Sequence, residues 1–148
     1  MPRPGRLGNR LFDRLLRRGL TLAFAESLTG GRLSAGLVER PGASAFFLGA
    51  TVVYSEEAKK RLLGVREETL RNFGAVSPQT ALEMVRGLER VLPAGALAAV
   101  TGIAGPGGGS PEKPVGTVYG AFILEGKVFH RAWVFKGSRR RILRACAG

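Results

Sequence analysis

The chain has 148 residues, of which 45% are hydrophobic and 23% are charged, as in a globular protein with an ordinary core. Its apolar runs are shorter than the roughly 18 residues of a membrane span, and its first residues alternate arginine with leucine, unlike a signal peptide. We therefore expect a single cytoplasmic domain, residues 1–148, with no membrane partner. The lone cysteine (Cys146) and lone histidine (His130) exclude an internal disulfide and the familiar zinc sites.

The net charge of +12 is concentrated at the two ends of the chain. Residues 1–18 contain six arginines and one aspartate, whereas residues 126–148 contain seven basic side chains and no acidic one. If the two ends lie together in space, they would form a surface for nucleic acid. Solvated, arginine-rich helix faces are the other explanation, and we favour them because no aromatic side chains interleave the arginines.

The residue pattern alternates strands with helices and then ends in a hairpin and a short helix. Ser77-Pro78, for example, is a typical helix start, a capping residue followed by proline at the first helical position. Strands are expected at residues 20–25, 46–54 (buried), 97–103, 116–124 and 127–135. Helices are expected at residues 6–18, 29–39, from 56 onward after the cap Ser55, 66–73, 78–91 and 138–146. This order predicts an α/β fold with a mixed sheet covered by helices on both faces.

Residues 101–117, TGIAGPGGGSPEKPVGT, form the most constrained segment of the chain. Glycines expose backbone N–H groups, and three prolines (Pro106, Pro111 and Pro114) remove the freedom that glycine adds. A stiffened glycine loop between two strands is typical of an anion-binding cradle, and a long connector is the alternative.

If the first three strands run parallel, their carboxyl ends bring Ser27, residues 54–59 and the glycine loop to one edge of the sheet. A Ser-His-Asp set is absent, because His130 falls in the late hairpin, but a serine can also be activated by a neutral lysine. Burial lowers the pKa of a lysine, and a tyrosine hydroxyl can relay its proton. Ser27, Tyr54 and Lys59 supply these three groups. Their alternative roles are a helix cap, a strand end and a solvated lysine pair.

Five strings, AESLTGG (25–31), PGAS (41–44), YSEEAK (54–59), GAVS (74–77) and the glycine loop, occur in the order typical of one family. Together they resemble the CinA C-terminal domain family, the nicotinamide mononucleotide (NMN) deamidases. The similarity runs from about residue 7 to Arg144. The chain departs from the family pattern at Leu28, Glu56 and Ser138, where the family commonly has cysteine, asparagine and aspartate.

This resemblance implies a three-layer α/β/α sandwich around a mixed, mainly parallel sheet of about five strands. It also implies hydrolysis of the NMN carboxamide to nicotinate mononucleotide and ammonia, with no metal and no cofactor. The family's serine, tyrosine and lysine fall on Ser27, Tyr54 and Lys59. The expected substrate-binding residues are Thr29, Gly30 and Gly31, as oxyanion amides, and Thr101, Gly102, Gly105, Gly107, Gly108, Lys113 and Arg139 for the phosphate and ribose.

Relatives also suggest a homodimer, for which Phe46-Phe47 or the helices would provide the interface. The alternative function is that of a weakly active or inactive protein, related to competence or damage response, that binds a nucleotide or a DNA partner through its basic ends.

Overall fold

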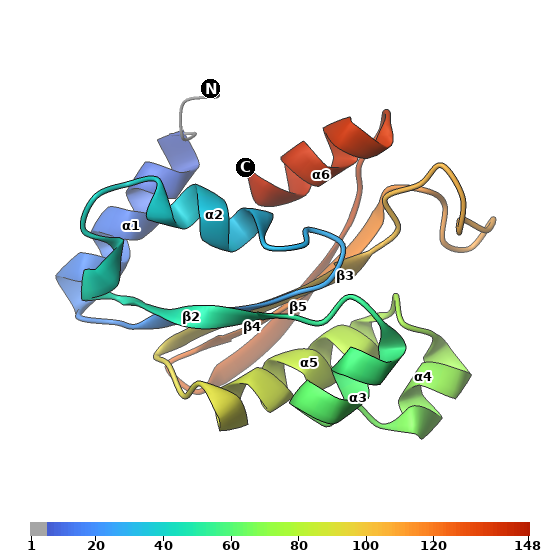
Figure 1. Ribbon diagram of the computed structural model, residues 1–148, viewed down its shortest axis with the longest axis horizontal. Coiled ribbons are helices and arrows are strands. Elements are labelled where there is room, and N and C mark those ends of the chain that lie inside the picture. Colours follow the sequence, from blue (N-terminus) through green and yellow to red (C-terminus); the bar gives the residue numbers. More distant parts are fainter. Residues whose placement is uncertain (1–5) are drawn as a thin grey trace.

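The computed structural model describes residues 6–148, which form one sheet with helices on both faces (Figure 1). The strands are β1 (Leu22–Glu26), β2 (Phe47–Val52), β3 (Ala96–Gly102), β4 (Thr117–Leu124) and β5 (Lys127–Val134). The helices are α1 (Arg6–Arg18), α2 (Arg32–Val38), α3 (Glu56–Leu63), α4 (Glu67–Phe73), α5 (Pro78–Val91) and α6 (Arg139–Ala147), with a 3₁₀ turn η1 (Ala43–Ala45).

The sheet has the order β2-β1-β3-β4-β5 and is mixed. β1 pairs in parallel with both β2 and β3, whereas β4 is antiparallel to its two neighbours. β5 therefore runs in the same direction as β1, β2 and β3, and only β4 is reversed. The predicted mixed, mainly parallel sheet is confirmed, and the carboxyl ends of β1, β2 and β3 meet at one edge.

The helices form two layers, with α1, α2 and α6 above the sheet and α3, α4 and α5 below it (Figure 1). Below, fully buried Met84 and Leu88 of α5 belong to the same core cluster as Ala99 and Ala121 of the central strands. Above, Phe12 of α1 packs edge-on against Phe46 at 4.6 Å between ring centroids. The three-layer α/β/α sandwich is thus confirmed.

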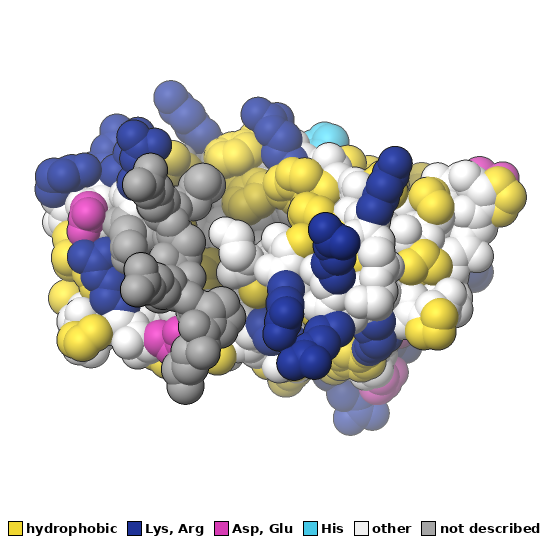
Figure 2. All heavy atoms as spheres, turned by 90° about the horizontal axis from the view of Figure 1, so that it is seen from above, with side chains coloured by type: hydrophobic (Ala, Val, Ile, Leu, Met, Phe, Trp, Pro, Cys, Tyr) yellow, Lys and Arg dark blue, Asp and Glu magenta, His cyan; other side chains and the backbone are white. Residues whose placement is uncertain are grey.

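Basic side chains gather on the upper face: Figure 2 shows Lys and Arg side chains over it with few acidic ones between them. α1 and α6 hold the two basic ends of the chain and lie in the same layer, although residues 1–5 lie outside the described residues. Within residues 6–148, every helix is too short or too polar to cross a bilayer.

The helix N-caps predicted from the sequence are confirmed. The hydroxyl oxygen of Ser55 accepts a hydrogen bond from the Ala58 amide at the start of α3, and that of Ser77 accepts one from the Thr80 amide at the start of α5. α2, by contrast, begins at Arg32 and not at Thr29, because Gly30 and Gly31 adopt left-handed backbone conformations (φ 55° and 96°) that interrupt a helix.

The prediction that residues 46–54 form a buried strand is wrong. The strand is not buried, because β2 is an edge strand of the sheet and Leu48, Val52 and Tyr54 are each about half exposed. Of the Phe46-Phe47 pair expected at a dimer interface, Phe46 is only 2% exposed and its ring packs against Phe12, whereas Phe47 is partly exposed.

Candidate active site

A cleft of about 340 Å3 opens at the carboxyl ends of β1, β2 and β3. This is the edge at which ligands bind in parallel α/β sheets. The residues that line it come from the β1–α2 turn, the segment after β2, α3, the α4–α5 loop, the glycine loop and the start of α6. They are Ser27, Leu28, Tyr54, Lys59, Ala75, Val76, Thr101, Gly102, Ile103, Ala104, Gly105, Gly107, Gly108 and Arg139.

A buried lysine contacts the serine at the centre of this cleft. Lys59 is only 1% exposed, and its Nζ lies 3.0 Å from Ser27 Oγ, 2.9 Å from the carbonyl oxygen of Val53 and 3.4 Å from that of Tyr54. In the neutral amine, two N–H bonds would point to the carbonyls and the lone pair to the serine hydroxyl. Neither Ser27 nor Lys59 therefore plays the alternative role of helix cap or solvated lysine.

The environment of Lys59 favours the neutral amine. Burial lowers the pKa of Lys59 from its ordinary value of 10.5, and the nearby Glu56 carboxylate opposes this shift. A lysine with a lowered pKa is more often neutral near pH 7 and can accept a proton. The geometry and the charge thus support the same chemistry, the activation of Ser27.

Ser27 is held in place by its neighbour Glu26, which is fully buried. The Glu26 carboxylate accepts hydrogen bonds from the Thr29 hydroxyl, from the amides of Gly31 and Leu33, and from the Ser34 amide and hydroxyl. Burial acts to raise the pKa of Glu26, but the hydrogen bonds from Ser34, Thr29 and Leu33 together outweigh it and hold this pKa below its ordinary value of 4.5. The carboxylate thereby folds residues 27–34 around itself and fixes the turn that carries the serine.

This turn corrects the predicted roles of Thr29, Gly30 and Gly31. The Thr29 side chain is buried on Glu26, the Gly31 amide also donates to Glu26, and the Gly30 amide donates to the Ser27 carbonyl. None of the three lines the cleft. These residues shape the serine turn, and the two glycine amides are already engaged within the chain.

Tyr54 and Arg139 meet at the mouth of the cleft. Arg139, the first residue of α6, donates one hydrogen bond to the Tyr54 hydroxyl (3.0 Å) and one to the Gly105 carbonyl (2.8 Å). The Tyr54 hydroxyl thus faces Arg139, and Tyr54 contacts Lys59 through its carbonyl oxygen. The predicted proton relay through the Tyr54 hydroxyl is therefore not the arrangement in the structure.

The glycine loop forms the opposite wall. Thr101 is buried and donates its hydroxyl hydrogen to the Ala75 carbonyl (2.8 Å), which joins β3 to the α4–α5 loop. Gly105 has a φ of 79°, and a side chain there would overlap with Val115. Lys113, expected at the phosphate, does not line the cleft: its ammonium donates to the Phe73 carbonyl at 2.7 Å and ties the loop to α4.

Sequence reasoning missed five lining residues, Leu28, Ala75, Val76, Ile103 and Ala104. All are apolar, so they carried no chemical signal of their own. Ala75 and Val76 fall within the GAVS string, and its similarity to the family was the signal that could have placed them in the site.

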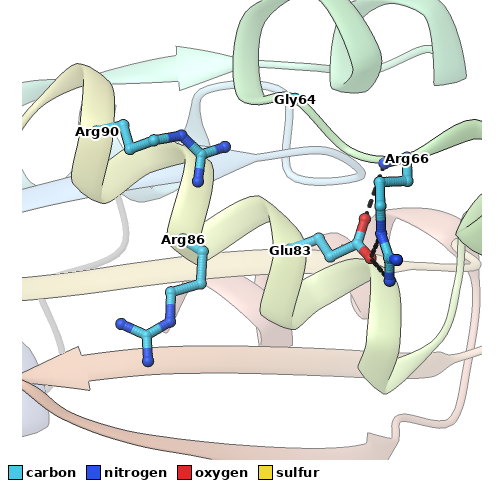
Figure 3. A pocket seen from close by; sticks show the side chains of 5 residues that line it. All are labelled: Gly64, Arg66, Glu83, Arg86 and Arg90. Atoms are coloured by element: carbon cyan, nitrogen blue, oxygen red, sulfur yellow. Dashed lines mark hydrogen bonds and ion pairs between the residues drawn. The ribbon is translucent and has the colours of Figure 1, made fainter.

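A second, shallower pocket of about 300 Å3 lies on the lower layer and is lined by Gly64, Arg66, Glu83, Arg86 and Arg90 (Figure 3). Its charged groups already have partners within the chain. Glu83 accepts hydrogen bonds from the Arg66 amide and guanidinium, and Arg90 donates to the Leu63 carbonyl. These contacts fasten α4 and α3 to α5 and suggest no ligand.

The fold and the site place the chain in a known family. The sequence pattern of the CinA C-terminal domain matches residues 5–148, and the chain belongs to this family. It is 49% identical over 132 residues to a CinA-like protein of Petrotoga mobilis, covering 89% of this chain and 33% of that protein. The chain thus spans about a third of the length of the curated relatives that it matches.

Solved structures of the family have the same fold. The competence/damage inducible protein CihA of Agrobacterium tumefaciens is 42% identical, with a TM-score of 0.93 over 99% of this chain and 91% of that one. The competence damage-inducible protein A of Klebsiella pneumoniae is 34% identical, with the same TM-score and coverage.

Proposed function

We propose that this chain is an amidohydrolase that converts NMN to nicotinate mononucleotide and ammonia. The observation that carries the proposal is the 3.0 Å contact between Lys59 Nζ and Ser27 Oγ inside a cleft, with the lysine buried and its pKa lowered. The family supports it, since the resemblance on Ser27, Tyr54 and Lys59 is to its NMN deamidases.

In the proposed mechanism, neutral Lys59 takes the hydroxyl proton of Ser27 as Ser27 Oγ attacks the carboxamide carbon. The Lys59 ammonium then returns this proton to the amide nitrogen, the C–N bond breaks, and ammonia leaves an acyl-serine ester. A water molecule next attacks the ester while Lys59 again accepts a proton, and the acid product departs as Ser27 regains its hydrogen. This sequence uses only the two side chains and water.

The rest of the cleft suits the nucleotide portion of such a substrate. Arg139 is the cation at the mouth, and the glycine loop beside it presents backbone without side chains at Gly107 and Gly108. A guanidinium and exposed amides are the usual partners of a phosphate. In this proposal Tyr54 orients Arg139 through its hydroxyl.

Ammonia release from NMN by the purified chain tests the proposal. Ser27→Ala and Lys59→Met should each lower the rate by roughly 10³-fold or more, because each removes one half of the nucleophile–base pair. Lys60→Met is the matched control, since Lys60 is the adjacent lysine and pairs with Glu57 outside the cleft. A wild-type chain that releases no ammonia, or a Ser27→Ala variant with full activity, would contradict the proposal.

A second candidate function, nucleic-acid binding, is favoured by one observation: α1 and α6 bring both basic ends of the chain to the same face (Figures 1 and 2). If this face binds DNA, affinity should fall steeply with salt and should drop further in Arg140→Gln/Arg141→Gln, whose side chains are exposed outside the cleft. Arg61→Gln/Arg71→Gln, two exposed arginines of the lower layer, is the control. A DNA affinity that does not change with salt, or that changes in neither double variant, would exclude this function.

A further inference from the structure

Four aromatic rings form a continuous row across β4 and β5. Phe122 stacks on Phe129 at 5.1 Å between ring centroids and meets Trp133 edge-on at 6.4 Å. Trp133 in turn stacks with Phe135, also at 6.4 Å. The rings of Phe122 and Trp133 approach each other over Gly120, where a Cβ atom would come within 2.9 Å of both. We call Phe122, Phe129, Trp133 and Phe135 the aromatic row.

Strand pairing places the aromatic row on the upper face of the sheet, away from α5. Phe129 lies opposite Phe122, whose neighbour Ala121 faces the lower core cluster, so Phe122 and Phe129 point upward. Trp133 shares the face of Phe129, because the two are four residues apart in one strand. Phe129 and Trp133 are 41% and 38% exposed, and the other two rings are partly buried. The row thus presents aromatic surface to solvent.

Basic side chains lie beside the row. Arg131 shares its face, between Phe129 and Trp133, with the guanidinium 6.0 Å from the centre of the Phe129 ring, and Lys127 precedes them on the same face. Residues 126–148 contain no acidic side chain. Within the described part of the chain, no carboxylate pairs with Lys127 or Arg131. Aromatic and basic side chains therefore alternate along one face of β5.

The two basic helices lie at the ends of the row. Near the β4–β5 turn, Arg18 of α1 pairs with Glu125 at 3.5 Å. At the other end, Phe135 packs against the cluster that contains Leu143 of α6. Figure 2 shows hydrophobic side chains exposed on this upper surface, with Lys and Arg side chains around them. The aromatic row thus lies between the two helices that carry the basic ends of the chain.

We propose that the aromatic row binds single-stranded nucleic acid, with bases stacked on Phe129 and Trp133 and phosphates paired with Lys127 and Arg131. Aromatic rings accept the face of any base, and a single strand offers bases and phosphates to one surface together. A duplex keeps the faces of its bases inside its own stack. The proposal rests on the second candidate function, for which it names the nucleic acid and a separate surface, and it does not depend on the amidohydrolase.

Trp133 is the only tryptophan of the chain, so its fluorescence reports on the row directly. Titration of the purified chain with a short oligothymidylate should quench this fluorescence, because a base stacks on the indole. An abasic oligomer of the same length, which keeps the phosphates and lacks the bases, should bind roughly tenfold more weakly. Duplex DNA should leave the fluorescence unchanged. Equal affinities for the two single-stranded oligomers, or no quenching at saturation, would overturn the proposal.

Phe129→Leu tests the stacking without a change of charge. It keeps an apolar side chain but removes the ring, so the dissociation constant of the oligothymidylate should rise roughly tenfold while that of duplex DNA stays the same. Val128→Leu is the matched control, because Val128 is the adjacent residue, is 36% exposed and faces the other side of the sheet. Circular dichroism and thermal melting establish that both variants are folded.

The remaining outcomes separate this proposal from the others. Duplex binding that Arg140→Gln/Arg141→Gln weakens, with oligothymidylate binding that Phe129→Leu leaves intact, would overturn the aromatic row and keep the second candidate function. A chain that binds no nucleic acid would overturn both. Quenching of Trp133 by anionic lipid vesicles and not by the oligomer would assign the row to a membrane surface instead. Phe129 lies outside the cleft, so Phe129→Leu should release ammonia from NMN at the wild-type rate.

Discussion

At the scale of single residues, the chemistry depends on a lysine that the fold removes from water. An exposed lysine is an ammonium at neutral pH and cannot take a proton from a serine. Lys59 instead is only 1% exposed, and its Nζ contacts two backbone carbonyl oxygens and Ser27 Oγ. Its proposed role thus comes from burial and not from the residue type alone.

The pH dependence of ammonia release should follow the titration of Lys59. Only the neutral amine accepts a proton, so kcat/KM should rise with pH and level off above the pKa of Lys59, which burial places below 10.5. Glu56→Gln should move the midpoint to lower pH, because the Glu56 carboxylate raises the pKa of Lys59. A rate that falls as pH increases through this range would argue against Lys59 as the base.

Glu26 acts as a positioning residue through its contacts, and its replacement tests this. Glu26→Gln keeps the shape of the side chain but sets an NH2 group against hydroxyl and amide donors, so urea unfolding should show a loss of about 2–3 kcal/mol of unfolding free energy. Ammonia release should fall through kcat more than through KM, since the serine turn and not the nucleotide wall is disturbed. Thr29→Val, which removes one of the five donors, should have a smaller effect of the same kind.

The pKa of Glu26 determines the direction in which acid changes the stability of the fold. The folded state holds this pKa below 4.5, so the stabilisation is complete above that pH and is lost as the pH falls through the lower folded value. Wild-type stability should therefore decline in this acid range, and the decline should be weaker in Glu26→Gln. Equal acid responses of the two proteins would contradict the assignment.

At the scale of elements, the position of α3 determines that of Lys59, and α5 holds α3 in place. The two helices cross closely at Gly87, where a side chain would overlap with the Leu63 carbonyl of α3. This close approach explains a glycine inside a helix, where alanine would otherwise be preferred.

A pair of glycine substitutions separates helix propensity from helix packing. Gly87→Ala should destabilise the fold by about 1–3 kcal/mol and lower activity, because α3 and Lys59 must shift. Gly36→Ala, at an exposed site in α2 with open space around it, should stabilise the fold by about 0.5–1 kcal/mol. Thermal unfolding measures both. Two changes of the same sign would show that packing at Gly87 is not the deciding factor.

At the scale of the whole molecule, the two ends of the chain that account for the net charge of +12 contribute α1 and α6 to the same layer above the sheet, where basic side chains gather. Like charges held on one face repel one another in the folded state and are farther apart in the unfolded chain. The concentration of charge therefore lowers stability unless counter-ions or a bound anion screen it.

Salt should therefore stabilise the protein. Between low ionic strength and about 0.15 M salt, screening should raise the unfolding free energy by roughly 1 kcal/mol, or the melting temperature by about 4 °C. Scanning calorimetry with sodium chloride measures the effect, and Arg140→Gln/Arg141→Gln should reduce it. A melting temperature independent of salt would show that the arginines are too far apart to repel.

Local signals in the sequence were sufficient for most elements. Ser55 and Ser77 marked helix starts, and glycine and proline marked the loops, because caps and turns depend on neighbouring residues. The exposure of β2 was not predictable in this way. An apolar run such as FLGATV looks the same whether it forms a central strand or an edge strand of the sheet.

The same distinction between local signals and tertiary contacts applies to the candidate site. The α/β class, the order of the elements, the family and the residue types able to carry the chemistry could all be predicted, because these depend on local pattern and motif. Which groups meet depends on how the chain folds. The fold set Lys59 on Ser27 and Arg139 on Tyr54, and it turned Thr29 toward Glu26 and Lys113 toward Phe73. Such contacts join residues up to 85 positions apart, and spacing along the chain carries no information about distances across a packed sheet.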